Sequence, residues 1–125
     1  MPHAAVCRSL VPILLLAACA SRIPETGFAP PEAIERAVTR YYERHASEEN
    51  QTCLTPYIDG LTRVTVVEQQ PDRLVLDVRY LYRDRLKDDN GNGIGSECTA
   101  YAERQFTLEK NDAGLEVVAM SDSWR

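Results

Sequence analysis

Few side chains in this chain of 125 residues could act as a nucleophile or a general base; it has four cysteines and two histidines. Serine or cysteine catalysis needs a histidine base held by an acid, and a cysteine nucleophile needs a free thiolate. His45 is the one histidine beyond the first 18 residues. It falls near the end of a predicted helix, where a protonated imidazole would interact favourably with the helix dipole and cap carbonyl groups. We therefore expect a structural role for His45 and a chain that is not an enzyme.

The first 18 residues have the layout of a secretory signal. One basic residue precedes an almost uninterrupted apolar run over residues 10–18, which is too short to span a bilayer. The tetrapeptide Leu16-Ala17-Ala18-Cys19 resembles the lipobox of bacterial lipoproteins. The resemblance implies cleavage before Cys19 and a lipid on its sulfur, which would anchor the chain in a membrane. The alternative is an ordinary cleaved signal followed by an incidental cysteine.

The residue after Cys19 and the charge of the chain bear on location and partners. Ala20 in this position, rather than aspartate, resembles the sorting signal of outer-membrane lipoproteins. It implies a lipid-anchored protein of the cell envelope that faces the periplasm, at the outer rather than the inner membrane.

The net charge is −5, and it becomes −6 when Arg8 leaves with the signal. A mildly acidic domain of this size lacks the excess of positive charge with which proteins bind the phosphates of nucleic acid.

Cys53 and Cys98 remain after Cys7 leaves with the signal and Cys19 takes the lipid. An exported compartment is oxidising, so this pair predicts one disulfide. Closing the loop between them would stabilise the domain by about 4 kcal/mol on the chain-entropy model. Two reduced thiols and half of a metal site are the alternatives, and the second is poor because only one further histidine and no further cysteine are present.

Residues 19–31 contain three prolines and a glycine without a helical or strand period. We expect them to form the lipidated cysteine and a flexible tether, followed by a single domain over residues 32–125. A helix is predicted at about 32–47, with charged residues on its other side. Its apolar stripe consists of Ile34, Ala37, Val38, Tyr41, Tyr42 and His45.

The hydrophobic period changes to two from residue 61 onward. We predict strands at 61–69, 74–83, 98–109 and 115–120. Short turns at 70–72 and 111–114 join the first two strands and the last two. A single amphipathic helix must bury its stripe against the sheet, so we predict an α+β fold with one helix on a four-stranded antiparallel meander.

The helix with its Tyr41-Tyr42 pair, the meander and the closing strands resemble cystatin-like and NTF2-like α+β domains. The chain departs from the NTF2-like pattern because it lacks room for the extra helices that close that family's cavity. The resemblance implies, as one possibility, a pocket for a small ligand or for catalysis that uses Asp77, Tyr80 and Arg104 from the concave face of the sheet. We instead expect Asp77 to face solvent and Arg104 to extend its guanidinium to solvent at the edge of the sheet.

The segment Asp88-Asp89-Asn90-Gly91-Asn92-Gly93 matches the opening half of an EF-hand calcium loop. Oxygen ligands at alternate positions and a glycine at the sixth allow a chain to wrap a hard cation. Asp88, Asn90, Asn92 and Glu97 would supply the ligands of a weak calcium site, the only cofactor that we consider. Thr99 stands where the bidentate glutamate belongs, so a long hairpin connection is the favoured interpretation.

Three functions are compatible with this sequence. The first is a non-catalytic, lipid-anchored module that binds another periplasmic or outer-membrane protein, through exposed strand edges among other surfaces. The second is the NTF2-like pocket, and the third is protease inhibition by analogy with cystatins, for which Thr65 to Gln69 lack the family's Gln-x-Val-x-Gly loop. A weak calcium-binding envelope protein remains a further alternative. We favour the first.

Overall fold

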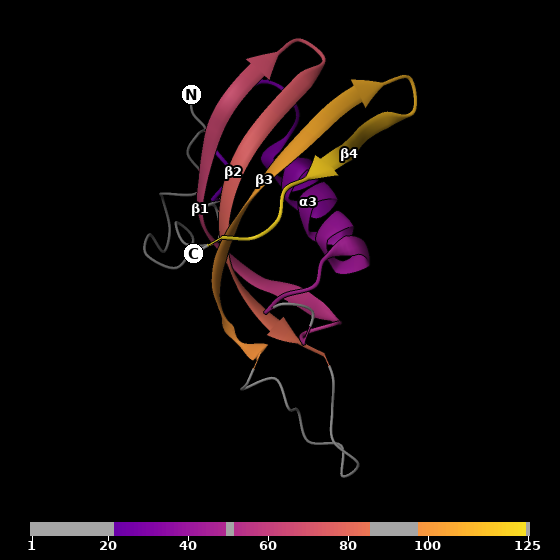
Figure 1. The fold of residues 1–125 in the computed structure, drawn as a ribbon. Coiled ribbons are helices and arrows are strands. Elements are labelled where there is room, and N and C mark those ends of the chain that lie inside the picture. The colour runs from indigo at the N-terminus through magenta and orange to yellow at the C-terminus, as the bar shows by residue number, and fades with distance from the viewer. Residues whose placement is uncertain (1–21, 50–51, 86–97, 125) are drawn as a thin grey trace, which may run out of the picture.

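One helix lies across one face of a four-stranded antiparallel sheet (Figure 1). The computed structural model describes residues 22–49, 52–85 and 98–124. The elements are α3 (Pro31–His45), β1 (Pro56–Gln70), β2 (Arg73–Asp84), β3 (Ala100–Asn111) and β4 (Gly114–Met120). The strands lie in chain order, each antiparallel to the next. The predicted α+β meander is therefore confirmed.

The helix begins and ends where its local sequence favours it. Pro31 occupies the first turn, where its missing N–H costs no hydrogen bond, and Glu32 places an acid near the positive end of the dipole. Ile34, Val38 and Tyr42 of the predicted stripe are fully buried against the sheet. His45 is exposed at the last helical position, so its predicted place on the buried stripe is wrong.

The core lies between the helix and alternate residues of β2 and β3. On β2 the even-numbered residues from Leu74 to Tyr82 face the helix and are buried. On β3 the corresponding residues include Ala102, Phe106 and Leu108. This alternation is the strand period that the sequence predicts.

Strand β1 is longer than its alternation suggests. It begins at Pro56 rather than at residue 61, and its pairing with β2 shifts register at three points. Each bulge adds a residue to one strand and reverses which face the next side chain takes. The hydrophobic period is therefore lost over residues 56–60, where Pro56 and Gly60 also lower strand propensity.

The segment before the helix packs against the domain over its described part, which differs from the flexible tether expected for residues 19–31. Ile23 and Phe28 are 2% and 4% exposed and belong to the core. The carbonyl oxygens of Thr26 and Phe28 accept hydrogen bonds from Gln69 and Lys110, at 2.9 and 2.8 Å. Two apolar side chains and two strand-end donors are enough to hold this short segment in place.

Cys53 and Cys98 form the predicted disulfide, with their Cα atoms 5.8 Å apart. It joins the loop between α3 and β1 to the segment just before β3. No helix in the described part of the chain has the length and apolar character that crossing a membrane requires.

We expect loss of this disulfide to lower stability strongly. The bond closes a sequence separation of 45 residues, and on the chain-entropy model its removal costs about 4 kcal/mol, which lowers the melting temperature of a domain of this size by roughly 15–30 °C. Calorimetry of a Cys53→Ala/Cys98→Ala variant measures the loss. Reductant should lower the melting temperature of the unaltered chain by a similar amount and leave the variant unchanged. Equal melting temperatures for the two oxidised proteins would contradict the expectation.

Candidate functional site

The polar side chains inside the domain gather where the end of α3 crosses β2 and β3. Arg104 on β3 and Tyr80 on β2 both face the helix, and Arg104 is 5% exposed. Its Nε donates a hydrogen bond to the Tyr80 hydroxyl at 2.8 Å. Arg104 lies in an inner strand of the sheet, so the expectation that its guanidinium reaches solvent at the sheet's edge is wrong.

Glu48, in the loop that follows α3, supplies the negative charge for Arg104. It is 1% exposed, and its Oε2 atom lies 3.4 Å from Nη2 of Arg104. The same oxygen accepts hydrogen bonds from the hydroxyls of Tyr42 at 2.7 Å and Tyr80 at 2.6 Å. A buried charge requires an opposite charge and hydrogen bonds of this kind, because the free energy of removing it from water is otherwise too unfavourable for the folded state.

The remaining donors of Arg104 connect three parts of the chain. Nη1 donates to the carbonyl oxygen of Ser121 at 2.8 Å, and Nη2 donates to that of Ser47 at 2.7 Å. The guanidinium therefore ties β3 to the loop after the helix and to the segment after β4. We call Arg104, Glu48, Tyr42 and Tyr80 the buried cluster.

Backbone contacts next to the disulfide hold the loop that carries Glu48. Glu48 and Cys53 exchange two backbone hydrogen bonds, at 3.0 and 3.1 Å. Glu49 adopts a positive φ of 54° and accepts a hydrogen bond from the hydroxyl of Tyr82 at 2.6 Å. The disulfide at Cys53 thus fixes the turn that presents Glu48 to the interior.

Burial and hydrogen bonding keep both tyrosines of the buried cluster neutral. Burial is the largest cause that raises the pKa of Tyr42, followed by the neighbouring Tyr80 and by Glu48. Burial also raises the pKa of Tyr80, and its hydrogen bond to Glu48 raises it further. Burial by itself would lower the pKa of Arg104, but Tyr80 and Glu48 outweigh it and raise that pKa. The cluster therefore consists of neutral tyrosines and a charged guanidinium at physiological pH.

The three residues of the possible pocket are not brought together. Tyr80 and Arg104 meet in the buried cluster, but Asp77 lies on the opposite face of β2, where its Oδ1 accepts a hydrogen bond from Gln105 at 3.1 Å. Within the described residues, Tyr80 and Arg104 direct their polar atoms at other protein atoms rather than at an open cavity.

Sequence reasoning missed Glu48 and the polar role of Tyr42. Tyr42 was predicted only as an apolar helix residue. Glu48 stands in the polar run Ser47-Glu48-Glu49-Asn50, where nothing local separates a buried acid from an exposed one. The unmatched arginine at a core position of β3 was the one available signal that an acid had to come from elsewhere.

The predicted lipidation site and the predicted calcium loop lie outside the described residues, and the described residues near the disulfide do not form a metal site. Cys19 and the calcium-loop residues Asp88, Asn90, Asn92 and Glu97 belong to the undescribed part. The Asp84 carboxylate lies within 4.8 Å of the sulfur atoms of Cys53 and Cys98. Those sulfur atoms are bonded to each other, and Asp84 accepts two hydrogen bonds from Thr55, so this trio is no evidence of a metal site.

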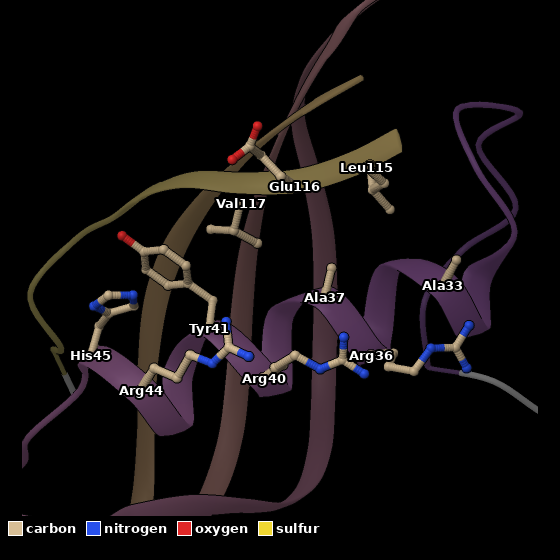
Figure 2. A pocket seen from close by; sticks show the side chains of 10 residues that line it. All are labelled: Ala33, Arg36, Ala37, Arg40, Tyr41, Arg44, His45, Leu115, Glu116 and Val117. Carbon is tan, nitrogen blue, oxygen red and sulfur yellow. The ribbon is translucent and has the colours of Figure 1, made fainter. Parts of the chain in front are cut away.

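A surface groove runs between α3 and the edge strand β4 (Figure 2). Its volume is about 490 Å³. Leu115 and Val117 point from β4 toward the helix, and the Tyr41 ring packs on His45 with centroids 4.1 Å apart. Arg36, Arg40 and Arg44 form a row along the helix side of the groove. We call these three residues the arginine row.

The fold and its two polar regions define an α+β protein with one helix on a four-stranded antiparallel sheet. Comparisons of the chain with protein-family models, with curated proteins and with solved structures found no match. The cystatin-like or NTF2-like likeness is thus one of layout alone.

We expect Arg104 and Glu48 to be strongly coupled in stability. Arg104→Met leaves Glu48 as an uncompensated buried charge and should cost about 3–5 kcal/mol. Glu48→Gln should also destabilise, but the double variant should lose about 1–3 kcal/mol less than the sum of the single losses. Urea denaturation measures all three. Arg63→Met, which removes an exposed ion pair with Glu103, is the control and should cost less than about 1 kcal/mol. Strict additivity of the two cluster substitutions would refute the coupling.

The raised tyrosine pKa values predict loss of stability at high pH. Tyr42 and Tyr80 keep their protons in the folded state, whereas unfolded tyrosines release theirs near pH 10. Above that pH the folded state binds more protons, so the free energy of unfolding falls, by up to about 2.7 kcal/mol per pH unit for the two groups. Urea titrations from pH 8 to 11 measure the slope. Tyr42→Phe or Tyr80→Phe should reduce it, while Tyr101→Phe, at a 49% exposed position, should leave it unchanged. A slope that does not respond to either cluster substitution would disprove this origin.

Proposed function

We propose that this protein is a lipid-anchored, non-catalytic module of the cell envelope that binds another envelope protein. The anchor is the lipid on Cys19, and the domain faces the periplasm, at the outer membrane. The observation that supports the non-catalytic part is that Arg104 and Tyr80 direct their polar atoms at other protein groups, although one buried carboxylate oxygen of Glu48, Oε1, has no hydrogen-bond partner among the described residues. Arg104 and Tyr80 are the two residues best suited to a reactive pocket. Their polar atoms instead form hydrogen bonds with each other, with Glu48 and with backbone carbonyl groups.

The exposed features support a binding role. Strand β4 is at one end of the sheet, so one of its sides is available for pairing with another chain. The groove beside it has the size of an ordinary binding site. A surface with an apolar floor and a charged rim is typical of recognition.

The predicted secretory signal and the cysteine that follows it support the proposed location in the cell envelope. The apolar run over residues 10–18 and the tetrapeptide that ends at Cys19 stand in the order that lipoprotein processing requires. The Cys53–Cys98 disulfide fits an oxidising compartment such as the periplasm. Two or three acyl chains would hold the domain durably, because each buried CH2 group contributes about 0.8 kcal/mol.

We expect Cys19→Ser to abolish anchoring. In a Gram-negative host the unaltered chain should remain in the membrane pellet after a high-salt wash, and mass spectrometry should find a lipid on residue 19. The Cys19→Ser variant should lack the lipid and should not be processed at the same site. Cys7→Ser, which changes a cysteine inside the leader, is the matched control and should behave as the unaltered chain. A Cys19→Ser chain that is still processed and still stays with the washed membranes would end the anchoring proposal.

A further inference from the structure

The arginine row is exposed and without an ionic partner in the described part of the chain. On the sheet, Arg63, Arg73 and Arg83 each pair with a carboxylate, at 3.3, 3.9 and 2.7 Å. The Arg79 guanidinium has no carboxylate among the described residues but lies over the Tyr101 ring. None of the ion pairs or side-chain hydrogen bonds among residues 22–49, 52–85 and 98–124 involves the guanidinium groups of the row. The arginine row therefore places three cations without a carboxylate partner among the described residues beside one groove.

The spacing of the row carries a cost for the helix. Arg36, Arg40 and Arg44 stand four residues apart, so they are neighbours on one face. Like charges at this spacing destabilise a helix by roughly 0.2–0.5 kcal/mol per pair. An anionic ligand that binds along the row would offset that repulsion. The chain itself has a net charge of −5, so the row is a local cationic site on an acidic protein.

The opposite wall of the groove is the free edge of the sheet. Figure 2 shows β4 running alongside α3, with Leu115 and Val117 directed toward the helix and Glu116 pointing away from it. Glu116, the one acid among the lining residues, accepts a hydrogen bond from Asn111 at 2.8 Å. The groove thus offers an apolar floor, a strand edge and a row of cations.

The geometry of the two walls matches an extended peptide. Four residues of a helix advance about 6 Å, and two residues of a strand advance about 6.8 Å. A strand added beside β4 would direct every second side chain toward α3, at nearly the spacing of the row. Flexible arginine side chains would absorb the difference of about 1–2 Å over three positions. A flat anionic membrane would contact the row but would leave the strand edge and the groove floor unused.

We infer that the groove between α3 and β4 binds an acidic, extended segment of the partner protein, which adds to β4 as a fifth strand and places carboxylates at alternate positions against Arg36, Arg40 and Arg44. This inference rests on the proposed partner-binding function and specifies its partner. Main-chain pairing supplies affinity, and the arginine row selects acidic side chains in the right register.

The test uses the full chain in a non-ionic detergent and a fluorescein-labelled peptide of alternating valine and glutamate. A peptide of the same composition with its four glutamates contiguous is the register control. The alternating peptide should bind more tightly than its control, and salt should weaken it. Arg40→Glu/Arg44→Glu should weaken binding by about tenfold or more. Arg73→Glu/Arg79→Glu changes the charge equally on the opposite face of the sheet and should change binding less than about twofold.

Hydrogen exchange distinguishes strand addition from charge attraction alone. Peptide binding should protect backbone amides within residues 115–119 from exchange, because a new strand covers the free edge of β4. Equal binding of the two peptides, or unprotected β4 amides, would overturn the inference. It would also fail if Arg40→Glu/Arg44→Glu abolished binding to phosphatidylglycerol vesicles but not to the peptide. The Cys19→Ser fractionation is independent of these outcomes, so a failed groove and a failed anchor are separately recognised.

Discussion

The buried charge of Arg104 is the constraint on which the rest of this domain depends. A guanidinium at a core position of an inner strand is tolerated only with an anion and with acceptors for its remaining N–H groups. Glu48 supplies the anion, and the carbonyl oxygens of Ser47 and Ser121 accept two of the hydrogen bonds. One side chain thereby sets the positions of the loop after the helix and of the segment after β4. The Tyr80 hydroxyl links the two charges, since it accepts a hydrogen bond from Arg104 and donates one to Glu48, and the Tyr42 hydroxyl donates a second hydrogen bond to Glu48.

The disulfide gains a second role from this arrangement. Besides restricting the unfolded chain, it holds Cys53, whose backbone pairs with that of Glu48. An acid in a surface loop would otherwise turn to solvent, where its charge is best stabilised. Covalent closure next to Glu48 makes the inward orientation less costly in entropy. The stability of the fold and the neutralisation of its internal charge are therefore linked through one short loop.

Charge is handled differently inside and outside the domain. In the interior, Arg104 and Glu48 form an ion pair and Asp84 accepts hydrogen bonds from Thr55, and on the sheet three arginines pair with acids of other strands. The helix is the exception, since Arg36, Arg40 and Arg44 face a groove rather than a carboxylate. The polar groups of the buried cluster thus contact one another in the interior, whereas the three arginines of the row are exposed on the surface, where another molecule can reach them.

Local periodicity by itself determined the helix, four strands, the two tight turns and, with the parity of the cysteines, the disulfide. These features follow from neighbouring residues, because a period of 3.6 or 2 selects one buried face of each element. Tertiary structure alone decided the burial of Arg104, its partnership with Glu48 across 56 positions of the chain, the packing of Ile23 and Phe28, and the separation of Asp77 from Tyr80. Each of these depends on which distant group fills the space opposite, and three bulges in β1 also reset the alternation that the sequence pattern relies on. Periodicity identifies the face that a residue takes, and only the fold identifies what that face meets.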